Sequence, residues 1–217
     1  MAIEAILLDL DGTVLNTIDD LADSVNYALS TLGFPVRSTE YVRAICGNGP
    51  RDLIRRALPK NISDDDFENC LAAFKKHYEI NKTNKTAPYD GIIQALSELK
   101  SRGFKLALVS NKHDDALRAL NDRYFSELID FSIGSSDSIP KKPAADMVYL
   151  ALEKLGTDRS CAVYVGDSEV DILTAKNSSI PCISVAWGFR DEEVLKQAGA
   201  SNIIYTASEL VTAIENL

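Results

Sequence analysis

Short apolar runs alternate along the chain with longer segments in which apolar residues recur at helical spacing. Within the runs, successive residues are apolar rather than every second one, which is typical of strands in a parallel sheet covered on both faces. Alternation of such strands with helices favours right-handed crossovers and a doubly wound, parallel α/β sheet. The pattern predicts strands at Ala5–Leu8, Lys105–Val109, Ile129–Ile133, Ala162–Val165 and Ile183–Val185, and helices at Ile92–Lys100, Asp114–Asn121 and Asp146–Leu155.

The alternation is interrupted between about residues 17 and 80, where no convincing strand is found. The polar stretch at residues 81–88 ends in proline and looks like a connector. We therefore predict an α/β core domain of residues 1–16 and 86–217, and a helical domain of residues 17–85 inserted after the first strand. An insert at that point would lie over the carboxyl edge of the sheet, where open α/β folds bind ligands. The helices predicted within it are Asp19–Leu32, Thr39–Cys46, Arg51–Leu58 and Asp64–Ile80.

The formal net charge of −9 argues against a general nucleic-acid-binding surface, which would be basic. An anionic substrate must then be attracted by a local group of cations, a metal ion or helix ends. The N-terminus lacks the basic start and long apolar stretch of a secretory signal, and no apolar run could span a bilayer. The four cysteines are widely scattered, and buried reduced thiols are the simplest interpretation. We expect a cytoplasmic protein that binds neither membranes nor nucleic acids.

Two carboxylates follow the first apolar run, in Asp9-Leu10-Asp11-Gly12-Thr13. Both can face a crevice if the strand ends there, and Gly12 then permits a tight turn. Asp9 could attack a phosphorus atom to form an aspartyl-phosphate, and Asp11 could protonate the leaving oxygen and later deprotonate water. An anionic nucleophile approaches an anionic phosphate only when charge is neutralised, so the pair also indicates a Mg²⁺ site. For the pair alone, a polar turn is the alternative.

Three further polar groups are predicted at strand ends or helix starts. Ser110-Asn111 follows a predicted strand, where a hydroxyl and backbone amides could bind a phosphate oxygen, although a helix cap would also explain the pair. Lys142 precedes a predicted helix, where cations are not favoured, and could neutralise both nucleophile and phosphoryl group. Asp167 and Asp171 would share one side of a helix that begins at Ser168, as a metal ligand and its supporting carboxylate or as acidic caps.

In this order the residues resemble the four motifs of the haloacid dehalogenase superfamily: Asp9-Leu10-Asp11-Gly12-Thr13, Ser110-Asn111, Lys142, and Gly166-Asp167 with Asp171. The resemblance covers essentially the full chain. Within the superfamily the chain is most similar to the phosphoglycolate phosphatase-type group. That similarity rests on three segments, Cys46-Gly47-Asn48-Gly49, Pro88-Tyr89-Asp90-Gly91 and Trp187-Gly188-Phe189-Arg190.

The resemblance implies a Rossmann-like core with a helical (C1-type) cap. It also implies a bound Mg²⁺ ion and a set of catalytic and binding residues. The metal would be bound by Asp9, the backbone carbonyl of Asp11 and Asp167, with Asp171 in support. Asp9 would be the nucleophile and Asp11 the acid/base, while Ser110 and Lys142 would hold the phosphoryl group. Thr13 and Asn111 would contact the substrate. The presence of Asp11 favours phosphoryl transfer, because the superfamily's dehalogenases lack this acid.

The helical insert should close over the site and contact the part of the substrate that leaves. Gly47-Asn48-Gly49-Pro50-Arg51 is the segment expected to reach it, because its glycines allow close backbone approach. Arg51 could pair with a substrate carboxylate. A loop between two helices, with Arg51 in solvent, is the alternative.

We therefore expect a Mg²⁺-dependent phosphatase for a small phosphate monoester, with 2-phosphoglycolate as the best substrate candidate and a monomer or weak homodimer as the assembly. Pyrophosphate hydrolysis and phosphosugar mutase activity are the enzymatic alternatives. A catalytically silent binding or regulatory protein is the alternative of a different class, since fold does not fix function.

Overall fold

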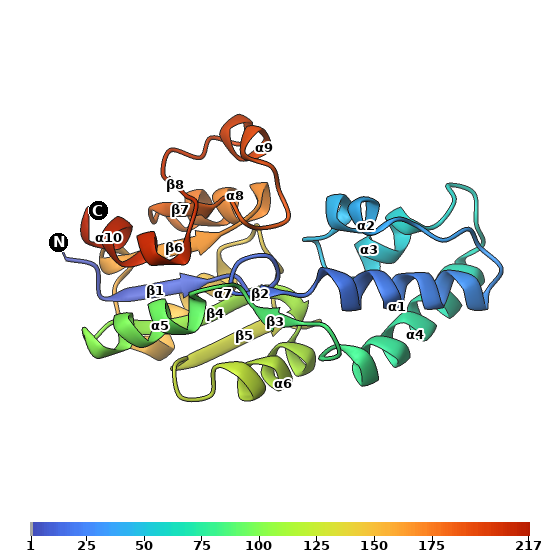
Figure 1. Ribbon diagram of the computed structural model, residues 1–217, viewed down its shortest axis with the longest axis horizontal. Coiled ribbons are helices and arrows are strands. Elements are labelled where there is room, and N and C mark those ends of the chain that lie inside the picture. Colours follow the sequence, from blue (N-terminus) through green and yellow to red (C-terminus); the bar gives the residue numbers. More distant parts are fainter. Residues whose placement is uncertain (1) are drawn as a thin grey trace. The chain divides into compact units, whose positions relative to one another are not determined.

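A parallel sheet with strand order β5–β4–β1–β6–β7–β8 organises the larger part of the chain (Figure 1). The structure is a computed structural model that describes residues 2–217. The chain divides into an α/β unit, Met1–Leu15 with Pro88–Leu217, and a helical unit, Asn16–Ala87. The strands of the sheet are β1 (Ala5–Leu8), β4 (Lys105–His113), β5 (Phe131–Ser135), β6 (Ala162–Gly166), β7 (Cys182–Val185) and β8 (Ile203–Ile204).

β1 lies between β4 and β6, and its register decides which loops meet at the edge of the sheet. Leu8 pairs with Leu108 of β4 and with Val165 of β6. The residues that follow these partners therefore emerge side by side at the carboxyl edge, where open parallel sheets bind ligands. They include Asp9, Ser110 and Asp167.

Alternate residues of β1 pack on opposite faces of the sheet. Ile6 and Leu8 belong to one apolar cluster, and Ala5 and Leu7 belong to another. Because both faces are buried, every position of this strand has to be apolar. The helices that contribute to these clusters are α5 (Ile92–Ser101), α6 (Asp114–Tyr124) and α10 (Leu210–Glu215) on the first face, and α7 (Asp146–Leu155) and α8 (Glu169–Ser178) on the second; α9 (Glu192–Gln197) follows β7. The predicted doubly wound α/β fold is confirmed.

Some strands differ in extent from their predictions. β4 extends past its predicted end and includes Ser110 and Asn111, so this pair lies within the strand rather than after it. β5 begins at Phe131, because the N–H of Ile129 bonds to the carbonyl of Phe125 in the turn that follows α6. The short β8 was not predicted, since two apolar residues give no periodic signal.

The helical unit contains α1 (Ile18–Thr31), α2 (Thr39–Ile45), α3 (Pro50–Ala57) and α4 (Asp64–Asn81). Local sequence explains the helix starts: Ser38 accepts the N–H of Tyr41, and Ser63 accepts the N–H of Asp66. Pro50 occupies the start of α3, where a backbone N–H is not needed. Two short strands, β2 (Leu15–Asn16) and β3 (Ala87–Pro88), pair where the chain passes from one unit to the other and back.

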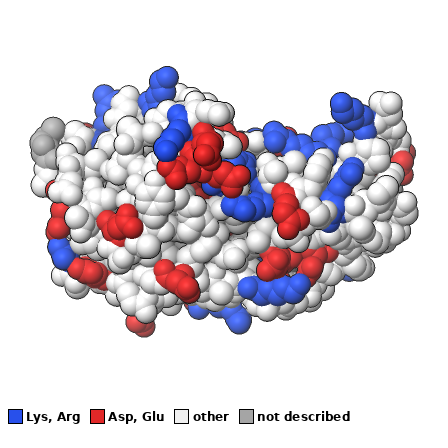
Figure 2. All heavy atoms as spheres, turned by 45° about the horizontal axis from the view of Figure 1, so that its top comes forward, with Lys and Arg blue, Asp and Glu red and all other residues white. Residues whose placement is uncertain are grey.

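Charged side chains of both signs are interspersed over the face displayed in Figure 2, in small groups rather than in one extended basic surface. Attraction of an anion to the displayed face would therefore depend on local groups.

Among residues 2–217, no helix has the length and apolar character needed to cross a membrane.

Asp20, in the first turn of α1, anchors the segment that precedes β3. Its carboxylate accepts the N–H of Lys85 at 3.0 and 3.1 Å and the N–H of Thr86 at 2.8 Å. The side chain is buried. A single carboxylate therefore satisfies two consecutive backbone donors in a place shielded from water.

Asp20→Ala is expected to lower the free energy of unfolding by about 2–3 kcal/mol, because it removes the acceptor from buried N–H groups. Urea unfolding followed by circular dichroism measures this loss, and Asp20→Asn should lose less because one oxygen remains. Asp23→Ala is the matched control, since its ion pair with the Lys85 side chain is 53–54% exposed and should contribute little. Superimposable curves for Asp20→Ala and wild type would contradict the anchoring role.

Candidate active site

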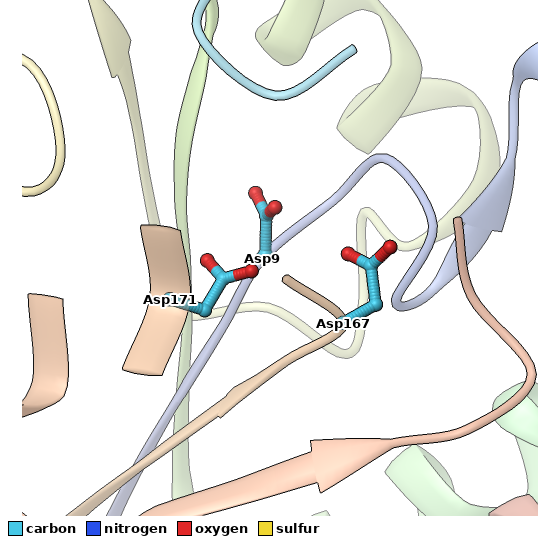
Figure 3. Close-up of side chains that lie close together, drawn as sticks. All are labelled: Asp9, Asp167 and Asp171. Carbon is cyan, nitrogen blue, oxygen red and sulfur yellow. The ribbon is translucent and has the colours of Figure 1, made fainter. Parts of the chain in front are cut away.

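Three buried aspartates converge at the carboxyl edge of the sheet. Asp9 follows β1, Asp167 follows β6, and Asp171 lies in the first turn of α8. One carboxylate oxygen from each lies within 4.8 Å of the others. Figure 3 shows these side chains grouped around one space. The pairing of β1 with β6 brings the first two together, and the start of α8 adds the third.

Asp9 is held through one of its oxygens. Oδ1 accepts the N–H of Leu10 at 2.8 Å and lies 3.0 Å from Nζ of Lys142. Burial raises the pKa of the Asp9 carboxyl to about 6; the Lys142 ammonium lowers this pKa, whereas the Asp171 and Asp11 carboxylates raise it. The ionised Asp9 is therefore in a place where a further positive charge would be favourable.

Lys142 is fully buried and contacts three acceptors. Its Nζ donates to Oδ1 of Asp171 at 2.8 Å and to the hydroxyl oxygen of Tyr164 at 2.9 Å, besides its contact with Asp9. Burial alone would lower the pKa of Lys142, but Asp171 and Asp9 outweigh it and raise the pKa well above 10.5. Nδ2 of Asn111 donates to the backbone carbonyl of Lys142 at 3.0 Å, which fixes the loop. A charged ammonium is thus locked beside Asp9.

Asp167 is enclosed by two loops. Its Oδ1 accepts the Thr13 hydroxyl at 3.2 Å, and its Oδ2 accepts the N–H of Phe189 at 2.7 Å. Two glycines line the same space, since a Cβ built on Gly12 or on Gly188 would lie 2.2 Å from an Asp167 side-chain atom. Gly12 also has a φ of +84°, which favours glycine. The direction of the Asp167 carboxylate is therefore set by backbone on both sides.

Asp171 is hydrogen-bonded through both of its oxygens. Oδ1 accepts from Lys142, and Oδ2 accepts the N–H of Ser168 at 3.1 Å and its hydroxyl at 2.6 Å. Ser168 is the N-cap residue of α8, and the bond from its N–H to Asp171 is part of a capping box at the helix start. Asp171 thereby connects the Lys142 ammonium to the first turn of α8.

Asp11 pairs with Lys112, a residue that the sequence analysis did not single out. Nζ of Lys112 donates to both oxygens of Asp11, at 2.9 and 3.1 Å. Lys112 is buried, whereas Asp11 is half-buried. Ser110 lies two residues earlier on β4, and its Oγ accepts the N–H of Lys112 at 3.4 Å. The Lys112 ammonium restrains the Asp11 carboxylate.

The contacts above connect all the site residues predicted in the α/β unit: Asp9, Asp11, Thr13, Ser110, Asn111, Lys142, Asp167 and Asp171. They also connect residues that the sequence analysis did not assign to the site, namely Lys112, Tyr164 and the loop that contains Gly188 and Phe189.

The predicted binding residues of the helical unit lie between α2 and α3 and at the start of α3. Gly47 is exposed and Asn48 is half-buried. The guanidinium of Arg51 donates to both oxygens of Glu68, at 3.1 and 2.7 Å, and lies 4.9 Å from the centre of the Phe67 ring. Contact of these residues with a substrate stays a prediction.

The carboxylate cluster fits a divalent cation. Burial raises the pKa of Asp167 well above 3.8, and the Asp171 and Asp9 carboxylates raise it further, against smaller opposing effects from the N–H of Phe189 and from Arg190. Three carboxylates therefore crowd a space in which their ionised forms repel one another. Oxygen ligands of this kind are those that Mg²⁺ prefers, and a bound cation would offset the repulsion.

Gly188→Ala is expected to weaken divalent-ion binding about 10-fold or more, because residues that orient metal ligands contribute on that scale. The added methyl would lie 2.2 Å from Cβ of Asp167 and 2.6 Å from the carbonyl oxygen of Gly12, so the carboxylate must move. Isothermal titration with Mg²⁺ gives the dissociation constant.

Gly199→Ala is the control for a general loss of stability. Its Cβ would meet no atom within 4 Å, but its φ of +95° is strained for alanine. This variant should unfold more easily and bind Mg²⁺ like wild type. A Gly188→Ala protein with the wild-type dissociation constant would contradict the role given to Gly188.

The chain is similar to a known family over most of its length. The profile of the family described as haloacid dehalogenase-like hydrolase matches residues 6–185. Phosphoglycolate phosphatase from Pseudomonas syringae pv. syringae (strain B728a) is 30% identical over 217 residues, which cover 95% of this chain and 78% of that protein. Phosphoglycolate phosphatase from Aquifex aeolicus (strain VF5) is 34% identical over 185 residues, which cover 85% of each chain.

A solved structure agrees with these sequence similarities. The protein from Lactobacillus delbrueckii subsp. bulgaricus ATCC BAA-365, assigned as a phosphoglycolate phosphatase, is 33% identical. Its crystal structure matches with a TM-score of 0.96 and covers 100% of both chains.

Proposed function

The chain belongs to the haloacid dehalogenase-like hydrolase family, and we propose that it is a Mg²⁺-dependent phosphatase that hydrolyses a small phosphate monoester through an aspartyl-phosphate on Asp9. The observation that carries this proposal is the contact of Asp9 with the buried ammonium of Lys142 inside a cluster of three carboxylates. A carboxylate placed in this way can approach an anionic phosphoryl group, because its own charge is partly neutralised.

Asp9, Asp167 and the backbone carbonyl of Asp11 are the proposed ligands of Mg²⁺, with Asp171 in support. When bound, the ion supplies positive charge that offsets the charge of the nucleophile and of the phosphoryl oxygens. The Thr13 hydroxyl and the N–H of Phe189 hold the Asp167 carboxylate in one direction, so this ligand is preorganised.

In the first proposed step, an oxygen of Asp9 attacks phosphorus, and the bond from phosphorus to the ester oxygen breaks. Asp11, which enters this step protonated and so keeps only one of its two contacts with Lys112, gives its proton to that oxygen, and the substrate's alcohol leaves neutral. Lys142 and Ser110 hold the phosphoryl oxygens during the transfer, with Thr13 and Asn111 as further proposed substrate contacts. The products are the alcohol and the aspartyl-phosphate.

In the second proposed step, a water oxygen attacks phosphorus and the bond from phosphorus to Asp9 breaks. Asp11, now ionised, takes the proton of that water, so inorganic phosphate leaves and both aspartates return to their initial states. The two N–H···O contacts from Lys112 keep the Asp11 carboxylate in one orientation between the steps.

We propose 2-phosphoglycolate as the substrate, on the strength of the names of the 30% and 34% identical relatives. This molecule carries a carboxylate beside its phosphate ester, and Arg51 is its proposed partner, with Gly47 and Asn48 beside it. The Arg51–Glu68 pair is 55–60% exposed, so it contributes little and can be exchanged for a substrate carboxylate.

Phosphate release from 2-phosphoglycolate, pyrophosphate and sugar phosphates in Mg²⁺ tests the proposal. We expect the highest kcat/KM with 2-phosphoglycolate. A preference for pyrophosphate would favour a pyrophosphatase, and isomerisation of a sugar phosphate without phosphate release would favour a mutase. If neither wild type nor Asp9→Asn releases phosphate from any compound of the panel, the result would instead favour a catalytically silent binding or regulatory protein.

Removal of divalent ions with EDTA is expected to lower the rate of phosphate release at least about 100-fold, since the ion neutralises charge worth several kcal/mol in the transition state. Added Mg²⁺ should restore the rate and raise the melting temperature, because the ion binds the folded state. A rate that survives EDTA would contradict the metal-dependent mechanism.

A further inference from the structure

We infer that Tyr164 is a positioning residue of the phosphoryl-transfer site, whose phenolic oxygen aims the ammonium of Lys142 at Asp9. The inference rests on the proposed function and adds to it a residue outside the four sequence motifs. Tyr164 lies in β6, three residues before Asp167, and is fully buried.

The hydroxyl of Tyr164 makes two hydrogen bonds. Its oxygen accepts from Nζ of Lys142 at 2.9 Å, and its hydrogen is donated to the backbone carbonyl of Val109 at 2.9 Å. Val109 directly precedes Ser110 on β4. One phenol thus links the strand that leads to Asp167, the strand that carries Ser110, and the loop of Lys142.

Packing alone does not explain a tyrosine at this position. β6 reads Ala-Val-Tyr-Val-Gly and is buried throughout, so a phenylalanine would fill the same space without the cost of burying a hydroxyl. The cost is offset only because both sides of the hydroxyl are hydrogen-bonded. Burial raises the pKa of Tyr164 well above 10, so the hydroxyl stays protonated and keeps its donor and its acceptor role.

Geometry explains what the hydroxyl does for Lys142. An ammonium has three N–H donors in a tetrahedral arrangement. Tyr164 and Asp171 take two of them at 2.9 and 2.8 Å, which fixes the rotation of the group and points the third at Asp9, 3.0 Å away. In the proposed reaction, the phosphoryl group binds on the side of the ammonium that this third N–H faces.

Tyr164 also differs from the other two partners of Lys142 in charge. Asp9 changes its charge when it is phosphorylated, and Asp171 is an anion that attracts the ammonium toward α8. The neutral phenol keeps the same contact through both steps. It therefore maintains the direction of Lys142 while Asp9 changes.

Tyr164→Phe tests this role, because it removes only the oxygen. We expect kcat to fall about 10- to 100-fold, as for misplacement of a catalytic group by a fraction of an ångström, with a smaller change in KM. Tyr164→Met is a second hydroxyl-free variant that fills the space flexibly and should lose kcat by a similar factor.

Ser178→Ala is the matched control for loss of a buried hydroxyl. Ser178 is fully buried in α8, and its hydroxyl donates to the carbonyl of Thr174 at 2.7 Å, as the Tyr164 hydroxyl donates to Val109. This variant should lose some stability and keep the wild-type kcat. A parallel loss of kcat in Ser178→Ala would assign the Tyr164 effect to general loosening of the core and overturn the inference.

A double-mutant comparison separates positioning from structure. In a Lys142→Met background, Tyr164→Phe should cause no further loss of kcat, since its effect passes through the ammonium. The same fold-loss in both backgrounds, or a Tyr164→Phe protein with kcat within twofold of wild type, would overturn the inference and leave the phosphatase proposal intact. Absence of Mg²⁺-dependent phosphate release by the wild type would overturn the proposed function itself.

Discussion

Asp9→Asn is expected to lower phosphate release by roughly 10⁴- to 10⁶-fold, the scale on which loss of a nucleophile reduces turnover. The amide has nearly the shape of the carboxylate, so the hydrogen bond from Leu10 and the surrounding packing can persist. What is lost is the anionic oxygen that is proposed to attack phosphorus. The measurement is phosphate release at saturating substrate and Mg²⁺.

Asp137→Asn, purified in parallel, is the control for contaminating phosphatases, because Asp137 is exposed and outside the site. It should release phosphate at the wild-type rate. An Asp9→Asn protein with more than a few per cent of wild-type turnover would remove Asp9 from the role of nucleophile.

The same substitution should raise the melting temperature when EDTA removes divalent ions at pH 8. Burial raises the pKa of Asp9 to about 6, so above that pH the wild type keeps a desolvated charge that the amide lacks. The stability that this carboxyl contributes is fully present below its unfolded-state value of 3.8 and is lost as the pH rises through 6. The difference in melting temperature should therefore shrink toward zero as the pH falls to about 4.

Lys142→Met is the second large effect, with an expected loss of kcat/KM of about 10²- to 10³-fold, the scale for removal of one transition-state donor. Unlike Asp9→Asn, it should also destabilise the metal-free protein, by roughly 3–5 kcal/mol, because it leaves buried carboxylates without their cation. Asp9 and Asp171 are the carboxylates that would lose their contact with the ammonium. Mg²⁺ should recover part of the stability and little of the activity.

Lys141→Met is the control for Lys142→Met, since Lys141 is the exposed neighbour of the buried lysine. Removal of its charge should change neither turnover nor the free energy of unfolding appreciably. If Lys142→Met turns over like wild type, the phosphoryl charge is neutralised elsewhere and the proposed mechanism must be revised.

The positions of Asp9 and Asp167 could be predicted because they follow strands that are apolar at every residue. Such strands are buried on both faces and run parallel, so their carboxyl ends share one edge. Lys142 was singled out because it precedes a predicted helix, where cations are not favoured, and the superfamily resemblance implied the same residue. Their possible roles followed from residue type and position, and the resemblance then implied one role for each.

The remaining contacts could not be read from the chain. Lys112 was not singled out because β4 was expected to end at Val109, and because its partner Asp11 lies 101 residues away in the sequence. Tyr164 lies in an apolar run and looked like a core residue, because the partner of its hydroxyl is distant in sequence. Phe189 contributes a backbone N–H, which any residue would supply.

The central place of β1 has a consequence for synthesis of the protein. β1 is translated first, yet its partners β4 and β6 lie beyond the whole helical unit. On the ribosome, the helical unit therefore emerges, and can fold, before β1 has any strand to pair with. Pairing across such long sequence separation is slow, so we expect the nascent chain to assemble the proposed active site late, once β6, α8 and the loop that contains Phe189 have left the exit tunnel.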